Sequence, residues 1–215
     1  MVSLIDRGGA KVDVTGVSTE QVRSDQVQWS FTIKSESANR SQGALIQEKQ
    51  VAQAIAFLEK NNISRDDIFV KVLFVSPNIE TNRETGKETM LGWKFSQEIV
   101  VISSDVDKVA EVSRRSSELI SNGVDARFQM PRFTYSGLAD KRIELLKEAT
   151  ENAKQRAKAI ATTGSLSLGR MTNVGTATFQ VTAPGSSSAG SGGLYDTDTI
   201  EKEVSAVMDV SFRLK

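Results

Sequence analysis

The sequence predicts an α+β fold with a ferredoxin-like split β-α-β core, an added long helix and a C-terminal β-hairpin. Several short runs alternate apolar with polar residues, as strands do, and three longer runs repeat apolar residues at helical spacing. These runs follow one another in the order β-β-α-β-β-α-β-α-β-β. The inner part, residues 26–135, reads β-α-β-β-α-β, which is the order of a split β-α-β unit.

Two alternating runs open the chain. Residues 11–15 form a short run that Gly16 ends, and residues 26–34 alternate over a longer stretch. Such alternation is typical of a half-buried strand. We expect these two strands to form a hairpin-like pair across residues 17–25.

The next segments predict a helix and a buried strand. Residues 39–60 repeat apolar side chains at three- and four-residue steps, and Asn39 is the expected cap. Ser64 begins a short capping turn. Residues 68–75 are apolar on both faces at nearly every position, which is typical of a central strand, and Pro77 is expected to break it.

Further strands follow in the middle of the chain. Residues 90–103 are strand-like and are joined to the preceding strand by the polar residues 80–89. This pattern predicts a hairpin with a long exposed tip. Residues 124–135 are extended, and Pro131 within them indicates an edge strand or a bulge.

Two more helices are predicted. Asp105 caps one that Gly123 ends, and the other runs from Leu138 to Gly164. Small residues on one helix face let it lie close to a sheet or to another helix. The long helix has such a face, formed by alanines at every fourth position: Ala149, Ala153, Ala157 and Ala161.

The end of the chain predicts two strands around a loop. Residues 170–181 and 200–214 are the strands. Residues 184–193 are rich in serine and glycine and offer almost nothing apolar to bury, so we expect a flexible loop that folding does not require. We assign the whole chain, residues 1–215, to one domain.

Composition excludes several classes of protein. The 215 residues contain 27 Lys and Arg and 27 Asp and Glu, so the formal net charge is zero. A nucleic-acid partner is not expected, because phosphate binding needs a clustered basic excess. The chain lacks cysteine and histidine, which excludes thiolate nucleophiles, Ser-His dyads and zinc fingers. No run of 18 apolar residues indicates a transmembrane segment.

For the candidate ligand residues, an ordinary structural or solvent-exposed role is favoured over ligand binding. Asp196, Asp198, Glu201 and Glu203 could offer oxygens to calcium, but their spacing is not that of an EF-hand, so solvated carboxylates are favoured. Residues 86–89 resemble a phosphate loop but lack its first glycine.

Aromatic and basic residues are weighed in the same way. A core role is favoured over a ligand cradle for three aromatic residues, and solvated helix faces are favoured for the basic ones. We therefore assign no catalytic, cofactor-binding or metal-binding residue and no cofactor. The residues considered are Trp29, Trp93, Phe95, Arg114, Arg115, Lys154, Arg156 and Lys158.

Three blocks in the right order span nearly the whole chain and resemble the SIMPL-domain family. They are VTGVSTEQVRSDQVQWSFTI at residues 14–33, EATENAKQRAKAIATTGSLSLGRMTNV at 148–174 and IEKEVSAVMDVSFRLK at 200–215. The resemblance implies an α+β fold, export to the periplasm or cell envelope, large ring- or channel-like homo-oligomers and, in some members, oxidative-stress tolerance. It carries over no catalytic residue. No signal peptide is recognisable, so export implies a signal that residues 1–215 do not contain.

We therefore expect a non-enzymatic exported envelope protein that acts by self-assembly. Two alternatives stay open. One is a small-ligand binding module that uses a sheet face, and the other is a hydrolase that works with carboxylates alone.

Overall fold

A computed structural model describes residues 10–186 and 194–215. The chain divides into two compact units: unit 1 is built from residues 1–23 and 135–215, and unit 2 from residues 24–134. The predicted flexible loop at 184–193 lies outside the described residues from position 187 onward, so its dispensability stays a prediction. No helix of the described residues has the length and apolar character needed to cross a membrane.

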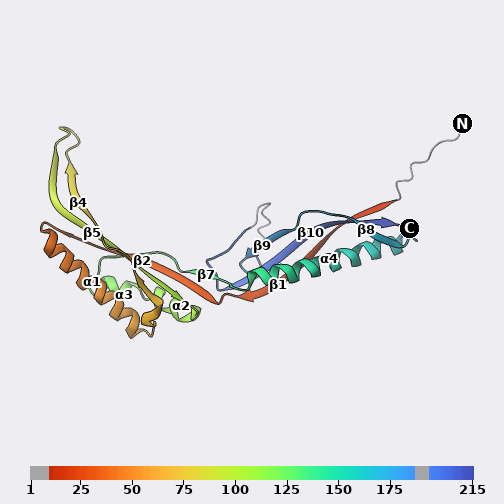
Figure 1. Cartoon of the computed structure of the whole chain (residues 1–215), viewed down its shortest axis with the longest axis horizontal. Coiled ribbons are helices and arrows are strands. Elements are labelled where there is room, and N and C mark those ends of the chain that lie inside the picture. Colours follow the sequence, from red (N-terminus) through yellow and green to blue (C-terminus); the bar gives the residue numbers. More distant parts are fainter. Residues whose placement is uncertain (1–9, 187–193) are drawn as a thin grey trace. The chain divides into compact units, whose positions relative to one another are not determined.

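Unit 1 is a four-stranded sheet with one helix on it (Figure 1). Its central strand, β10 (Glu201–Leu214), pairs antiparallel with β1 (Lys11–Arg23) along the full length of β1. On its other side β10 pairs with β8 (Leu168–Val174) and β9 (Thr178–Thr182). The helix α4 (Leu138–Thr163) packs on β1 and β10.

The core of unit 1 lies between α4 and the sheet. Alternate residues of β10 turn toward α4, and the predicted alanine face of α4 is 0–1% exposed, which confirms the close packing. The buried side chains include Val204, Ala206, Met208, Val210 and Phe212 of the strand and Ala149, Ala153, Ala157 and Ala161 of the helix.

Gly16 sets how closely α4 approaches β1. A Cβ atom at position 16 would lie 1.9 Å from the carbonyl oxygen of Ala149 and 2.8 Å from Cβ of Ala153. Both distances are too short for any side chain. The backbones of β1 and α4 are therefore in direct contact at this point.

The predicted pairing of the first two strands is wrong. Gly16 does not end β1, which continues to Arg23, and β1 and β2 belong to different sheets. The reason is that β10 offers β1 thirteen continuous partners, from Arg213 to Glu201, far more than a short local hairpin could. The prediction of one strand at 170–181 is also wrong, because the chain forms two strands there, β8 and β9. Between them, the N–H of Gly175 bonds to the carbonyl oxygen of Asp209.

Unit 2 has a six-stranded sheet in the order β3-β5-β2-β6, with β4 paired to β5 and β7 to β2. Every pair is antiparallel. In chain order its elements are β2 (Gln26–Ser37), α1 (Arg40–Lys60), a 3-10 turn (Arg65–Asp67), β3 (Ile68–Val70), β4 (Phe74–Thr81), β5 (Glu88–Ser103), α2 (Val106–Arg114), α3 (Ser117–Ser121), β6 (Ala126–Phe128) and β7 (Arg132–Thr134).

The α+β class is confirmed. In unit 2, β5 lies between β2 and β3 and is antiparallel to both, which agrees with a split β-α-β unit. Both edges of the sheet are broken into short pieces, β3 with β4 and β6 with β7. The finer ferredoxin-like description therefore stays a prediction.

One face of the unit 2 sheet is covered by α1 and α2. The buried Gln47 of α1 accepts a hydrogen bond from Ser35 at 2.8 Å and donates one to the carbonyl of Ile33 at 3.1 Å, which fixes the helix on β2. The predicted caps are confirmed, because Asn39 accepts from the N–H of Gln42 and Asp105 from the N–H of Lys108.

The prediction of a central strand at residues 68–75 is wrong. The chain forms β3 and β4 there, and both lie at the edge of the sheet. Phe69, Val72 and Phe74 are exposed, so the run is apolar without being buried. Pro77 does not break it: β4 continues to Thr81, because an edge strand tolerates a residue without an N–H. Residues 124–135 do form edge strands, β6 and β7, with Pro131 between them.

Candidate functional site

The most unusual side chain of unit 1 is Lys202, at the start of β10. It lies in the same alternating phase as Val204 and the other buried residues of that strand, and its side chain is 0% exposed. Lysine is almost never fully buried unless its charge is matched. Lys202 is not among the candidate residues that the sequence patterns indicate, although its phase in the alternation was a usable signal.

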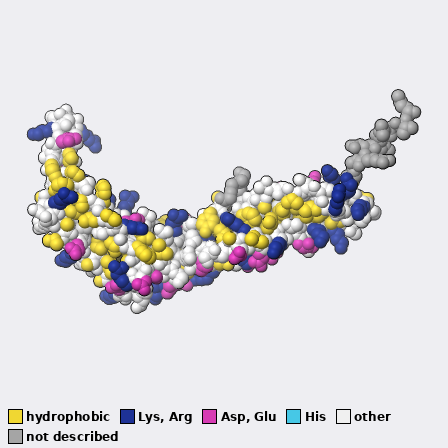
Figure 2. All heavy atoms as spheres, viewed as in Figure 1, with side chains coloured by type: hydrophobic (Ala, Val, Ile, Leu, Met, Phe, Trp, Pro, Cys, Tyr) yellow, Lys and Arg dark blue, Asp and Glu magenta, His cyan; other side chains and the backbone are white. Residues whose placement is uncertain are grey.

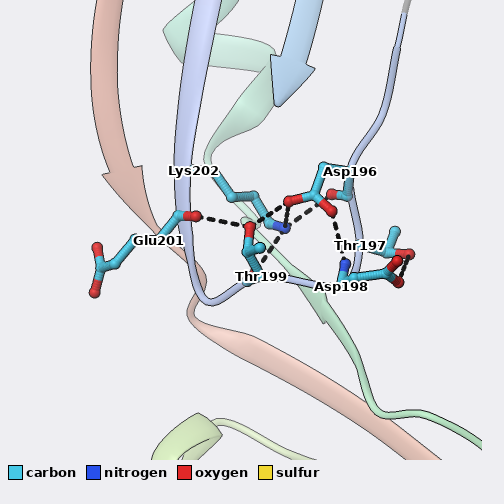
Figure 3. Close-up of polar contacts among 6 residues, drawn as sticks. All are labelled: Asp196, Thr197, Asp198, Thr199, Glu201 and Lys202. Atoms are coloured by element: carbon cyan, nitrogen blue, oxygen red, sulfur yellow. Dashed lines mark hydrogen bonds and ion pairs between the residues drawn. The ribbon is translucent and has the colours of Figure 1, made fainter. Parts of the chain in front are cut away.

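Three acceptors surround the ammonium group of Lys202 (Figure 3). Nζ donates to the carbonyl oxygens of Thr199, at 2.7 Å, and Asp196, at 2.8 Å. It also lies 3.4 Å from Oδ2 of the Asp196 carboxylate. An ammonium group has three donors, so all three are used within one short segment.

The Asp196 carboxylate also accepts hydrogen bonds from the segment that surrounds Lys202. Oδ1 accepts from the N–H of Asp198 at 2.9 Å, and Oδ2 accepts from the hydroxyl of Thr199. We call this cluster, Asp196, Thr199 and Lys202, the Lys202 clasp.

Burial and charge move the two pKa values of the clasp. Burial lowers the pKa of Lys202, and the nearby Asp196 carboxylate opposes this without cancelling it. Burial alone would raise the pKa of Asp196, but the hydrogen bonds from Thr199 and Asp198 and the charge of Lys202 outweigh it, so the pKa of Asp196 is lowered. The Asp196 carboxylate is therefore ionised at neutral pH, and it lies beside the Lys202 ammonium group.

A lysine with a lowered pKa beside a carboxylate is one sign of a nucleophilic site. In the clasp, however, the ammonium is bound by three acceptors of its own chain. A neighbouring hollow of about 340 Å³ is lined by Val181, Leu194 and Tyr195 together with Asp196, and Lys202 does not line it. The geometry is that of a structural tie between residues 196–199 and the start of β10.

The candidate calcium ligands do not converge. The Glu201 carboxylate points away from Asp196 and pairs with Arg23, and that of Asp198 contacts the hydroxyl of Thr197 (Figure 3). Asp196 already has the Lys202 ammonium as its cation. Across residues 10–186 and 194–215, no group of three or more acidic, His or Cys side chains is arranged to hold a metal ion.

The phosphate-loop candidate forms the tip of the β4–β5 hairpin, as the polar loop predicts. There the N–H of Gly86 bonds to the carbonyl of Asn82 at 2.9 Å, and the N–H of Lys87 bonds to the hydroxyl of Thr85 at 3.4 Å. These amides are used to close the turn, so they do not form a phosphate cradle.

The aromatic candidates are mostly core residues. Trp29 and Phe95 are buried, which confirms that prediction. Trp93 is half-buried, and the guanidinium of Arg40 lies 4.8 Å from the centre of its ring.

The basic candidates lie on solvated helix faces. Arg115 pairs with Glu118 at 2.8 Å on a solvated face, and Lys154 and Lys158 are exposed, as expected. Arg156 is exposed as well, and its guanidinium also donates to the backbone oxygen of Thr15 at 2.9 Å.

The open face of the unit 2 sheet carries a hollow of about 410 Å³. Its lining includes Lys34 and Glu36 from β2, Phe74 from β4 and Lys94 from β5. The Lys94 ammonium lies 3.9 Å from the Glu36 carboxylate. The hollow thus offers charges of both signs beside one aromatic ring.

Unit 2 also exposes a set of large apolar side chains on β3, β4 and β5 and on the link between β3 and β4. Figure 2 shows hydrophobic side chains gathered over the arm that β4 and β5 form in Figure 1. Each is 46–91% exposed. We call this set the apolar edge: Phe69, Val72, Phe74, Ile79, Met90 and Leu91.

The chain matches the model of a known protein family. The family model SIMPL, described as a protein of unknown function (DUF541), matches residues 12–212 and so includes residues of both units. No curated protein matches the chain significantly. With nearly its whole length matched, and with the α+β elements that the quoted blocks imply, the chain belongs to the SIMPL-domain family.

Proposed function

We propose that the protein is a non-enzymatic, exported cell-envelope protein that acts by self-assembly into a homo-oligomer. Its family is of unknown function and is not a known family of enzymes. The chain contains no histidine or cysteine, and the perturbed lysine of the Lys202 clasp is bound by its own segment. These observations favour a structural role over catalysis.

The apolar edge is the observation that carries the proposal. Contiguous exposed apolar patches are small in monomeric proteins, and larger ones mark interaction sites. Here Val72, in the link between β3 and β4, is 91% exposed, and Phe74, the first residue of β4, is 66% exposed. A second copy of the chain is the partner that self-assembly requires, and burial of such side chains would contribute favourably at roughly 25 cal/mol per Å².

Export and a role in stress tolerance rest on the family resemblance. Fractionation of cells that express the natural gene tests the location. Survival of a deletion strain in hydrogen peroxide tests the stress role.

Native mass in solution tests self-assembly. We expect the wild-type protein to be a multiple of its 23.4 kDa chain mass by light scattering. The variant Val72→Ser/Phe74→Ser should lose mass, because two side chains of the apolar edge become polar.

Leu45→Ser is the matched control, because Leu45 lies on α1, outside the apolar edge, and is as exposed as Phe74, at 66%. It should keep the wild-type mass. A wild-type protein that is monomeric at every concentration would refute self-assembly. Equal effects of the two variants would refute the role of the apolar edge.

A second candidate, a small-ligand binding module, is favoured by the hollow on the open sheet face. Lys34, Lys94 and Glu36 would suit a small zwitterionic or acidic molecule, and Phe74 offers an apolar contact. A thermal-shift screen of metabolites tests this function. A hit should disappear in Lys34→Met/Lys94→Met, and the absence of any hit would remove this candidate.

A further inference from the structure

The β1 strand is an edge strand with a long second side. In the described part of unit 1 it pairs with β10 alone, along all thirteen of its residues. The unpaired N–H and C=O groups of such an edge are a template for another strand. If β1 is to stay unpaired on this side, groups other than those of a second strand must bind its N–H and C=O groups.

Two side chains of α4 occupy the middle of that edge. The N–H of Val17 donates to Oδ1 of Asn152 at 3.1 Å, and the oxygen of Thr15 accepts from Nη1 of Arg156 at 2.9 Å. Asn152 and Arg156 are four residues apart, so they share one flank of the helix. The direct contact of α4 with Gly16 brings this flank within reach.

The same flank contacts β1 at two further places. The Ser18 hydroxyl donates to Oε2 of Glu148 at 2.5 Å, and the Lys141 ammonium lies 2.9 Å from Oε1 of Glu20. Positions 141, 148, 152 and 156 follow helical spacing, so they form one stripe. The polar stripe runs beside the buried alanine face and along the strand edge.

The two guarded backbone groups flank Gly16. A strand added in the antiparallel sense opposite Gly16 would place an N–H against the Thr15 oxygen and a C=O against the Val17 N–H. The Arg156 guanidinium and the Asn152 amide oxygen supply this donor and this acceptor. The side chains thus take the place of a missing strand.

The β1 edge of a second copy would fit this position. If two β1 strands paired antiparallel about a two-fold axis at Gly16, the Thr15 oxygen of each copy would accept from the Val17 N–H of the other. These are the same two groups that Arg156 and Asn152 bind.

The sequence of β1 also allows this pairing. In that register no like charges lie opposite each other over residues 11–21: Lys11 meets Gln21, Val12 meets Glu20 and Asp13 meets Thr19. The side chains of β1 therefore do not prevent this pairing, so the groups that prevent it must lie outside the strand.

We propose that Asn152 and Arg156 are an edge guard that keeps β1 from pairing with β1 of a second copy. The guard is a device of the fold that is separate from assembly through the apolar edge. The outer edge of β1 stays unpaired whether or not the chain assembles through the apolar edge.

The test is Asn152→Ala/Arg156→Ala in the full chain, compared with Lys154→Ala/Lys158→Ala on the same helix. Light scattering over a range of concentrations should show at least a doubling of mass for the guard variant relative to wild type. The control pair should keep the wild-type mass. A guard variant that folds, by circular dichroism, and keeps the wild-type mass at every concentration overturns the proposal.

A second substitution identifies the strand involved. Val17→Pro removes the N–H that faces the open edge and leaves the bonds to β10 in place, so adding it to the guard variant should restore the wild-type mass. Mass that stays doubled would show that association uses another surface. Because the chain lacks cysteine, Thr15→Cys/Val17→Cys in the guard variant should also give an intermolecular disulfide between positions 15 and 17.

Partial variants cover the case in which the double variant does not fold. Asn152→Ala alone should expose the Val17 amide to hydrogen exchange and give concentration-dependent mass, and Arg156→Lys, which keeps a donor for Thr15, should behave as wild type. Unchanged exchange and mass in Asn152→Ala would also overturn the proposal. Both outcomes are independent of Val72→Ser/Phe74→Ser, so failure of the guard is distinguishable from failure of self-assembly.

Discussion

A single methyl group at position 16 would test the contact between β1 and α4. Gly16→Ala would place Cβ 1.9 Å from a backbone oxygen that cannot rotate away, so the helix or the strand must shift. We expect a loss of about 1–3 kcal/mol in the free energy of unfolding, the usual range for overpacking. Urea denaturation monitored by circular dichroism measures it.

Gly164→Ala is the control, because the nearest atom to its added Cβ is 3.6 Å away and its φ is −82°. This variant should be close to neutral. Equal stability of Gly16→Ala and Gly164→Ala would show that α4 and β1 are not in the close backbone contact described.

The Lys202 clasp predicts a larger effect from losing one charge. Lys202→Met keeps most of the side-chain volume but leaves the Asp196 carboxylate and two carbonyl oxygens without their donor. A charged hydrogen bond contributes about 1.5–3 kcal/mol, so we expect a loss of at least that size. Thermal unfolding measures it, and Lys158→Met, at an exposed position of α4, should be neutral.

The pKa of Asp196 predicts how this contribution depends on pH. The folded pKa is lower than the unfolded value of about 3.9, so the contribution is fully present above that value and is lost as pH falls through the folded pKa. The lowered pKa of Lys202 has the opposite sign of effect on charge: stability rises with pH between the folded pKa and the unfolded value of about 10.4.

We therefore expect Asp196→Asn to destabilise the protein at pH 7 and to do so less at pH 3, which lies below the unfolded pKa. Urea denaturation at both pH values measures the difference. Asp198→Asn is the control, because that carboxylate lies outside the clasp. A difference between wild type and Asp196→Asn that stays the same at the two pH values would contradict the assigned role of the carboxylate.

Lys202 also marks a limit of sequence reasoning. Its place in the alternation Lys202, Val204, Ala206 indicates an inward side chain, but its charge suggests an outward one. Only the fold of residues 196–199 decides between them, because those residues supply the acceptors. Asn39 and Asp105 were predictable because a cap bonds within its own first turn.

At the scale of elements, α4 is the clearest case for mutation. Ala157 is fully buried on the close-packed face, whereas Lys158 is exposed one position later. We expect Ala157→Leu to lower stability by about 1–3 kcal/mol through overpacking. Lys158→Leu should leave the melting temperature nearly unchanged. Equal melting temperatures for both variants would mean that the alanine face does not pack as described.

Helices and strands differ in how well the sequence predicts them. The helices α1 and α4 repeat a pattern that depends on near neighbours, so their positions were predictable. The helix predicted from Asp105 to Gly123 begins at its predicted cap, but it is broken after Arg114 into α2 and α3. The pairing of β1 with β10 joins residues almost two hundred positions apart, and no local pattern indicates it. The strand predicted to be central at residues 68–75 failed for a related reason, since an apolar composition does not tell a buried strand from an edge that another molecule could cover.

At the scale of the whole molecule, the two units differ in how the chain builds them. Unit 2 is one continuous stretch, residues 24–134, with its own sheet, helices and buried side chains. We expect residues 24–134 expressed alone to unfold cooperatively on heating, because a domain with its own core can fold by itself. Differential scanning calorimetry measures this. If residues 24–134 expressed alone show no cooperative transition, the whole chain folds as a single cooperative unit instead.

The long pairing of β1 with β10 has a consequence for synthesis in the cell. A ribosome that has released residues 11–134 has delivered every residue of unit 2 but none of the partners of β1. Since loop closure must precede a contact between such distant residues, β1 is expected to wait as an unpaired strand until Glu201–Leu214 emerges. A nascent chain stalled before residue 201 should therefore protect unit 2 from protease and leave residues 11–23 open to cleavage. In such a chain, unit 2 matures during translation, whereas unit 1 matures only after its last strand has left the ribosome.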